Sequence, residues 1–107
     1  MREMLQFYID GEWVDPATPN TLDVINPATE TVCGQISLGS AEDVDKAVAA
    51  AKRAFPAFSA TSREERIALL ERILEEFAAR HDEVATANIE EMGAPWKLAK
   101  YAPVSYT

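Results

Sequence analysis

The chain has 107 residues, 48% of them hydrophobic and 26% charged, with four glycines and six prolines. This length suits one domain or part of one, and the composition is that of a folded protein. A formal net charge of -8 repels phosphate backbones and anionic lipids, so we expect neither nucleic acid nor membrane partners. No apolar run reaches the ~20 residues that span a bilayer. The single cysteine cannot form an intrachain disulfide, which fits a reducing compartment, so a cytoplasmic location is expected.

The first third of the chain is predicted to form short strands, because β-branched and aromatic residues alternate with turn-forming pairs. Asp10-Gly11 favours a two-residue hairpin turn, since glycine accepts a positive φ without penalty. The strands are expected at about Phe7 to Asp10, Glu12 to Val14, Leu22 to Ile25, and Val32 to Ser37.

A first helix is predicted over about residues 41–55. Ser40 can cap it, and the apolar residues that follow recur on one face at helical spacing. Pro56 removes a backbone donor and disfavours the helical conformation of Phe55, so the helix is expected to end there.

Two further helices are predicted over about residues 62–80 and 82–92. Ser62 and Glu65 have the spacing of a capping box, and Asp82 is expected to cap the next helix. Gly93 should end that helix, and Pro95 suits the first turn of another. The core face expected for the 62–80 helix consists of Ile67, Leu70, Ile73, Leu74, Phe77 and Ala78.

The chemical candidates in this sequence do not assemble into an active site. Cys33 has no cation nearby in sequence and is expected to be a buried or half-buried strand cysteine. His81 has no second ligand at metal-binding spacing and is expected to be a helix-end or surface residue. The glutamate pairs 64–65 and 90–91 point to different helix sides, and no glycine-rich phosphate-binding stretch is present.

Five stretches nevertheless resemble one known family when taken in order. They are FYIDGEWV, VINPATE, AEDVDKAVAAAKRAF, SREERIALLERILEEF and EEMGAP. Their order and spacing are similar to those of the N-terminus of the aldehyde dehydrogenase superfamily, and the resemblance covers almost the whole chain.

The resemblance implies an α/β parent enzyme, of which residues 1–107 form the N-terminal part of the NAD(P)-binding domain. The segment alone would be α+β, with a β-hairpin arm at about residues 7–37 followed by outer helices. The family oxidises an aldehyde to a carboxylic acid with NAD or NADP through a cysteine thioester. Its catalytic Cys and Glu motifs are not in this sequence, so catalytic and cofactor-binding residues are expected elsewhere in the parent and this segment is expected to be inactive.

The resemblance also implies a structural monovalent cation, Na⁺ or K⁺. Many members hold it with two backbone carbonyls before Asn-Pro and a carboxylate near the end of the third helix. These positions match Val24, Ile25 and Glu91. Several relatives have the shorter Asp at the last position, and a solvent-facing Glu91 is the alternative.

A different class of protein also fits these observations, namely a free-standing helical interaction module without catalysis. Its apolar faces would then bury against a partner. The family resemblance implies a small aldehyde substrate and a homo-oligomer for the parent. Neither the aldehyde, the choice between NAD and NADP, nor the oligomeric state follows from these residues.

Overall fold

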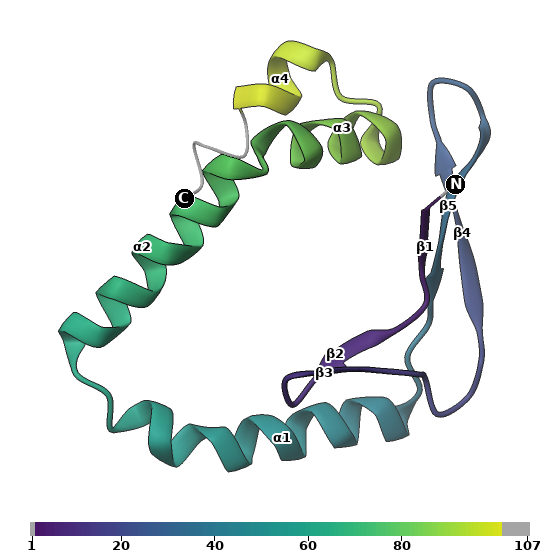
Figure 1. The fold of residues 1–107 in the computed structure, drawn as a ribbon. Helices are drawn as coiled ribbons and strands as arrows, with labels where there is room; N and C mark the ends of the chain where they lie inside the picture. Colours follow the sequence, from purple (N-terminus) through teal and green to yellow (C-terminus); the bar gives the residue numbers. More distant parts are fainter. Residues whose placement is uncertain (1, 102–107) are drawn as a thin grey trace. The chain divides into compact units, whose positions relative to one another are not determined.

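The structure is a computed structural model that describes residues 2–101, in which strands come first and helices follow (Figure 1). The strands are β1 (Arg2–Met4), β2 (Phe7–Ile9), β3 (Glu12–Val14), β4 (Thr21–Asn26) and β5 (Thr31–Ser37). The helices are α1 (Ala41–Ser59), α2 (Arg63–Ala79), α3 (His81–Met92) and α4 (Trp96–Tyr101). The described residues divide into two compact units, one of residues 2–24 and 32–60 and one of residues 25–31 and 61–101.

β2 and β3 form the predicted antiparallel hairpin. Tyr8 pairs with Trp13, and Phe7 with Val14. Between the strands Asp10 has a φ of 58° and Gly11 a φ of 84°. Positive φ at both central positions is the geometry of the tight hairpin turn that Asp-Gly favours, so this prediction is confirmed.

A second sheet contains β1, β5 and β4 in that order. The sequence predicted β4 and β5 but not β1, which runs parallel to β5 with Arg2 beside Gly34. A Cβ on Gly34 would lie 3.1 Å from the Arg2 carbonyl oxygen, so the missing side chain lets the two strands approach. Three exposed residues without alternation gave no signal for β1.

α1 begins as predicted and ends later than predicted. Ser40 caps it, but the helix continues through Pro56 to Ser59, so the expected end at Phe55 is wrong. The fixed φ of proline is itself helical, and the carbonyl of Lys52, which loses its helical donor and is crowded by the proline ring, lies on an exposed turn where water can bind it. The turn beyond Pro56 is held by a bond from Ser59 Oγ to the Pro56 carbonyl at 3.0 Å.

α2 confirms the predicted capping box. Glu65 N–H donates to Ser62 Oγ at 3.1 Å, and Ser62 N–H donates to the Glu65 carboxylate at 2.6 Å. These two bonds satisfy donors that the first helical turn leaves without intrahelical acceptors.

α3 begins one residue before the predicted cap. Its N-cap is Arg80, with no side-chain capping bond, so the assignment of Asp82 as the cap is wrong. Only Arg80 separates α2 from α3, which leaves Asp82 inside the first turn, where a carboxylate is still favourable to the helix dipole. Gly93 ends the helix in the left-handed conformation, as predicted.

α4 follows Pro95 as predicted, and the remainder of that expected element, residues 102–107, lies outside the described residues. α3 and α4 pack through small side chains, because Ala85 and Ala99 are both buried. No helix among residues 2–101 is both long and apolar enough to cross a bilayer.

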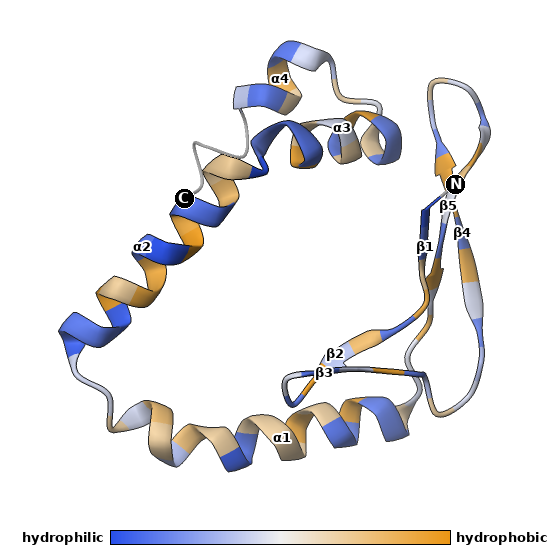
Figure 2. Cartoon of the chain, viewed as in Figure 1, coloured by the Kyte–Doolittle hydropathy of each residue, from blue (hydrophilic) through white to orange (hydrophobic). Residues whose placement is uncertain are grey.

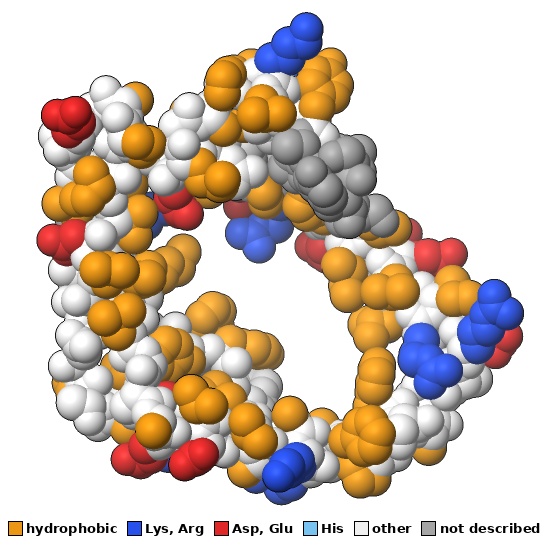
Figure 3. Space-filling view, turned by 180° about the vertical axis from the view of Figure 1, so that it is seen from behind, with side chains coloured by type: hydrophobic (Ala, Val, Ile, Leu, Met, Phe, Trp, Pro, Cys, Tyr) orange, Lys and Arg blue, Asp and Glu red, His pale blue; other side chains and the backbone are white. Residues whose placement is uncertain are grey.

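The buried apolar side chains of the described residues are alanines, and the larger ones lie at the surface. Apolar residues recur along α2, as the orange segments of Figure 2 show, yet Leu70 is 59% exposed and Ile73 is 53% exposed. Many hydrophobic side chains are likewise visible at the surface in Figure 3. The predicted α2 face therefore exists as a stripe, but in the described chain it is a surface and not a core.

Candidate functional site

The hairpin of β2 and β3 has two different faces. Phe7, Ile9 and Val14 are half-buried, and β2 packs against α1. On the other face Tyr8 and Trp13 are 63% and 65% exposed, and their ring centroids lie 5.2 Å apart. The hairpin thus rests on α1 by one face and presents an aromatic pair with the other.

Alanines on α1 allow the hairpin to come close. A shallow hollow of about 380 Å³ lies between the hairpin turn and the helix. Its lining residues are Tyr8, Ile9, Asp10, Gly11, Ala47, Ala50, Ala51 and Ala54. At its edge Arg53 Nη2 donates to Asp10 Oδ2 at 2.9 Å, which joins the hairpin tip to the helix.

A second hollow of about 490 Å³ lies on the same unit. It is lined by Glu3, Met4, Leu5, Gln6, Trp13 and Asp15. Gln6 Nε2 donates to the Asp15 carboxylate at 2.9 Å, so these two side chains are hydrogen-bonded to each other. Neither hollow combines a nucleophile with a base, as covalent catalysis would require.

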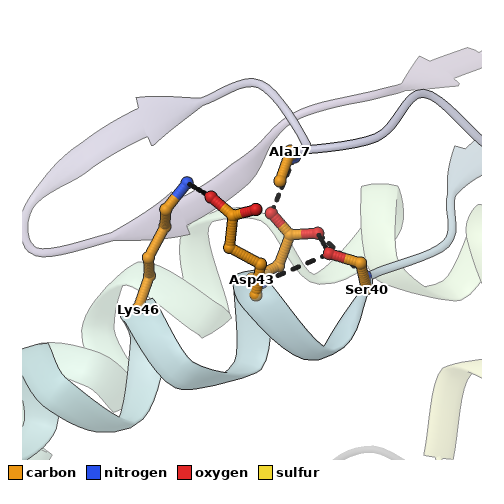
Figure 4. A network of polar contacts seen from close by, with 5 residues as sticks. Ala17, Ser40, Asp43 and Lys46 are labelled. Atoms are coloured by element: carbon orange, nitrogen blue, oxygen red, sulfur yellow. Dashed lines mark hydrogen bonds and ion pairs between the residues drawn. The ribbon is translucent and has the colours of Figure 1, made fainter.

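The Asp43 carboxylate ties a loop to the start of α1 (Figure 4). It accepts bonds from the backbone N–H of Ala17 at 2.8 Å, the backbone N–H of Ser40 at 2.8 Å and the Ser40 hydroxyl at 2.7 Å. The Ser40 N–H is the main cause that holds the pKa of this carboxyl below its usual value, followed by the Ala17 N–H and the Ser40 hydroxyl.

Sequence reasoning named Ser40 as a cap but missed Asp43. The signal was present, because Ser-x-x-Asp before an apolar run has the spacing of a capping box. The bond from Ala17, a residue 26 positions earlier, had no counterpart in the local pattern.

The Asn-Pro-Ala-Thr-Glu stretch forms the turn between β4 and β5. Asn26 Oδ1 accepts from the N–H of Ala28 at 2.9 Å and from that of Thr29 at 3.4 Å, while Glu30 N–H donates to the Asn26 carbonyl at 2.8 Å. Glu30 has a φ of 57°. The motif therefore acts as a folding signal, with Asn at the position that stabilises such a turn.

The turn packs on the end of α3. A Cβ on Gly93 would lie 2.8 Å from Pro27 Cγ, closer than real Cβ atoms approach a neighbour. Gly93 also needs glycine for its φ of 67°. Two of the stretches that the sequence singled out, around Asn-Pro and Met-Gly, thus meet within one unit.

The residues predicted to hold a cation lie in β4 and in the last turn of α3. Val24 is in β4, and its carbonyl accepts a bond from Cys33 Sγ at 3.3 Å. Ile25 is the next residue of β4, and Glu91 lies exposed in the last turn of α3. Among residues 2–101 no three His, Cys, Asp or Glu side chains gather to hold a metal. A site made of two carbonyls and one carboxylate stays a prediction.

Cys33 is a half-buried residue of β5, as expected. His81 lies at a helix end, as expected, but it is not an exposed surface residue. It opens α3, its side chain is only 20% exposed, and its Nδ1 lies 3.6 Å from Asp82 Oδ1. Its ring lies edge-on to that of Phe77 at the junction of α2 and α3, with the ring centroids 6.1 Å apart.

Comparison with known proteins assigns these features to a family. The model of the aldehyde dehydrogenase family matches residues 13–107. The 3-succinoylsemialdehyde-pyridine dehydrogenase of a Pseudomonas species is 53% identical over 95 residues, which are 89% of this chain and 20% of that protein.

Solved structures agree with the sequence match. An aldehyde dehydrogenase from Bartonella henselae has a TM-score of 0.93 at 47% identity, covering 95% of this chain and 21% of that one. Aldehyde dehydrogenase C of Pseudomonas syringae, solved with NAD⁺ and octanal, has a TM-score of 0.87 at 47% identity, covering 89% of this chain and 20% of that one. The chain spans about a fifth of the length of these relatives. By its family match and these likenesses, the chain belongs to the aldehyde dehydrogenase family.

Proposed function

We propose that this chain serves as the N-terminal segment of an enzyme that oxidises an aldehyde to a carboxylic acid with NAD⁺. The observation that carries the proposal is the match to the family over residues 13–107, together with a relative 53% identical that is named as a dehydrogenase. In such an enzyme a cysteine thiolate forms a thiohemiacetal with the aldehyde, hydride leaves to the nicotinamide, and water hydrolyses the resulting thioester.

No step of that chemistry is assigned to residues of this chain. Cys33 lies half-buried in β5, with its Sγ donating to the Val24 carbonyl. The glycines also have other roles, since Gly11 and Gly93 occupy positive-φ turns and Gly34 lets β1 approach. The sequence therefore offers no glycine-rich cradle that fits a dinucleotide, and we infer that the segment alone is inactive.

The contribution proposed for this segment is structural. The exposed stripe of α2, which includes Leu70 and Ile73, would bury against the rest of a longer aldehyde dehydrogenase chain. Full burial of a fully exposed side chain of this kind contributes about 1.5–3 kcal/mol, and Leu70 and Ile73, which are already partly covered, would each contribute a part of that. In this proposal the hairpin arm and the outer helices support the cofactor-binding domain without touching the reacting atoms.

The finer features of the parent enzyme are proposals of the same kind. One relative is named for a pyridine-bearing semialdehyde and another was solved with NAD⁺ and octanal, so an aldehyde is the proposed substrate class. NADP is the alternative cofactor to NAD⁺, and a cytoplasmic location and assembly into a homo-oligomer are further proposals. A monovalent cation bound through Val24, Ile25 and Glu91 belongs with them.

The proposal can be tested by exchange with the Pseudomonas relative. In a chimera, this chain replaces the matching fifth of the 3-succinoylsemialdehyde-pyridine dehydrogenase. We expect the chimera to form NADH with that enzyme's aldehyde, and the isolated 107-residue chain to form none. A folded chimera without activity, or NADH formation by the isolated chain with its mass confirmed, would contradict the proposal.

The exposed stripe of α2 also favours a second candidate, a free-standing interaction module. The two candidates, an enzyme segment and an interaction module, predict different behaviour of the isolated chain in solution. Sedimentation as a monomer with a cooperative melt favours the module, whereas self-association or partial unfolding favours a segment that needs the rest of its enzyme.

A further inference from the structure

The carboxylate of Asp43 is the most deeply buried charged group of the described residues, with the residue 5% exposed. Three donors converge on its two oxygens. Ala17 N–H is bound to Oδ1, while Ser40 N–H and Ser40 O–H are both bound to Oδ2. The Ser40 hydroxyl in turn accepts from Asp43 N–H at 3.4 Å. While the carboxylate is ionised, all three of these bonds are charge-assisted and therefore stronger than bonds to a neutral carboxyl.

A proton on this carboxyl would add a hydrogen-bond donor where three donors already converge. The proton turns one acceptor oxygen into an O–H donor, which would face donors already in place. The Ser40 hydroxyl can rotate to accept, but the backbone N–H groups of Ala17 and Ser40 cannot. The bond from Ala17 N–H would then go to a neutral carboxyl and be weaker, and because Ala17 is exposed, water can take the place of this acceptor, so the loop segment that carries Ala17 would leave.

The charged groups described around Asp43 do not oppose this effect. Lys46 lies on the next turn of α1 and forms an ion pair of 2.8 Å with Glu42. In the loop before Ala17, the Asp15 carboxylate accepts from Gln6. Both Glu42 and Asp15 retain solvent access, so Asp43 is the carboxylate whose ionisation the loop contact requires.

We propose that Asp43 is a protonation-controlled clamp on the hairpin arm. Ionised, it holds Ala17, and with it the loop that leads from β3 to β4, on the N-terminus of α1. When it takes up a proton, Ala17 is released while α1 remains helical. The neighbouring bond from Leu38 N–H to the Asn20 carbonyl, 2.8 Å long, contains no titratable group and holds the far end of the loop in both states.

The test is an NMR titration of the 107-residue chain that follows two signals. We expect the Ala17 amide proton to lie downfield at neutral pH and to move upfield in acid, with the same midpoint as the Asp43 carboxyl carbon. That midpoint should fall below the usual value for aspartate, because the same hydrogen bonds favour the ionised form. Amides within α1, such as that of Ala50, should not move.

Variants separate the clamp from general acid unfolding. In Asp43→Asn, which cannot ionise, the Ala17 transition should be absent. Ser40→Ala removes the hydroxyl donor and keeps the Ala17 contact. In this variant the Ala17 transition should remain, with its midpoint at a higher pH. Glu65→Gln removes the corresponding carboxylate of α2 and should leave Ala17 unchanged. An Ala17 signal that is flat through the Asp43 titration, already disordered at neutral pH, or lost together with the amides of α1 would overturn the proposal.

Discussion

Pro27 and Gly93 are neighbours at the join between the β4–β5 turn and the end of α3, where a Cβ on Gly93 would lie 2.8 Å from Pro27 Cγ. Gly93 is thus required twice, for its φ of 67° and for the space taken by the proline ring. We expect Gly93→Ala to lower the free energy of unfolding by about 1–2 kcal/mol through backbone strain and by about 1–3 kcal/mol more through overpacking.

Gly11→Ala is the matched control for that variant. Gly11 has a φ of 84°, but nothing lies within 4 Å of the position of its Cβ. It should therefore show the backbone cost of about 1–2 kcal/mol alone. Urea denaturation of both variants, and of Gly93→Ala combined with Pro27→Ala, measures the difference. If the two glycine variants are equally destabilised, or if removing the proline ring rescues nothing, the close contact has no energetic weight.

The buried alanines of α3 and α4 leave no room for larger side chains. Ala85 and Ala99 are 0% and 1% exposed. Enlarging Ala99 to Leu should cost about 1–3 kcal/mol, because the two helices must move apart. The same change at the exposed Ala57 on α1 is the control and should be nearly neutral. Thermal melts followed by circular dichroism would show the contrast, and equal melting temperatures for both variants would contradict it.

Acid should destabilise the chain through its capping carboxylates. The pKa of Asp43 is held below its ordinary value of 3.8 mainly by the Ser40 N–H, and the pKa of Glu65 below its ordinary value of 4.5 mainly by the Ser62 N–H. A carboxyl whose folded pKa is lowered gives stability that is present above the unfolded value and lost as pH falls through the folded value.

The free energy of unfolding should therefore decrease as the pH falls below about 4.5 and continue to decrease below 3.8. Urea midpoints measured across this range, for the unchanged chain and for Asp43→Asn with Glu65→Gln, give the comparison. The double variant should be less stable at neutral pH and should show a flatter dependence. Equal slopes for the two proteins would argue against this assignment of the acid sensitivity.

The apolar stripe of α2 should have opposite effects in the isolated chain and in a whole enzyme. Leu70→Gln removes a side chain that is 59% exposed here, so it should reduce self-association of the isolated chain with little loss of helicity. In the chimera with the Pseudomonas relative it should lower the yield of active enzyme, because the residue would then lie in an interface. Arg72→Gln, on the exposed polar side, is the control, and identical behaviour of the two variants in the chimera would count against the buried role.

Local signals in the sequence predicted much of this fold, and non-local contacts account for what they missed. The boundaries that were predicted correctly depend on conformations and bonds within a few residues. They are the hairpin turn at Asp10-Gly11, the start of α2 at Ser62 with Glu65, and the end of α3 at Gly93. β1 was missed because its partner, β5, lies about thirty residues away and its own residues do not alternate.

The candidate functional features divide in the same way. The capping role of Ser40 was predicted, while the contact from Ala17 to Asp43 depends on how the loop folds back. The end of α1 was predicted too early, because Pro56 was expected to end the helix. It lies on an exposed turn, and this turn tolerates the lost backbone hydrogen bond. Family membership followed from the order of five short motifs, none of which carries catalytic chemistry.

The central proposal, that these residues belong to a longer NAD-dependent aldehyde dehydrogenase, is tested most directly by the nucleotide sequence that follows the codon of Thr107. The account predicts that the reading frame continues without interruption into a chain that contains the family's catalytic cysteine and its catalytic glutamate. A stop codon directly after Thr107, or a continuation without those residues, would contradict it.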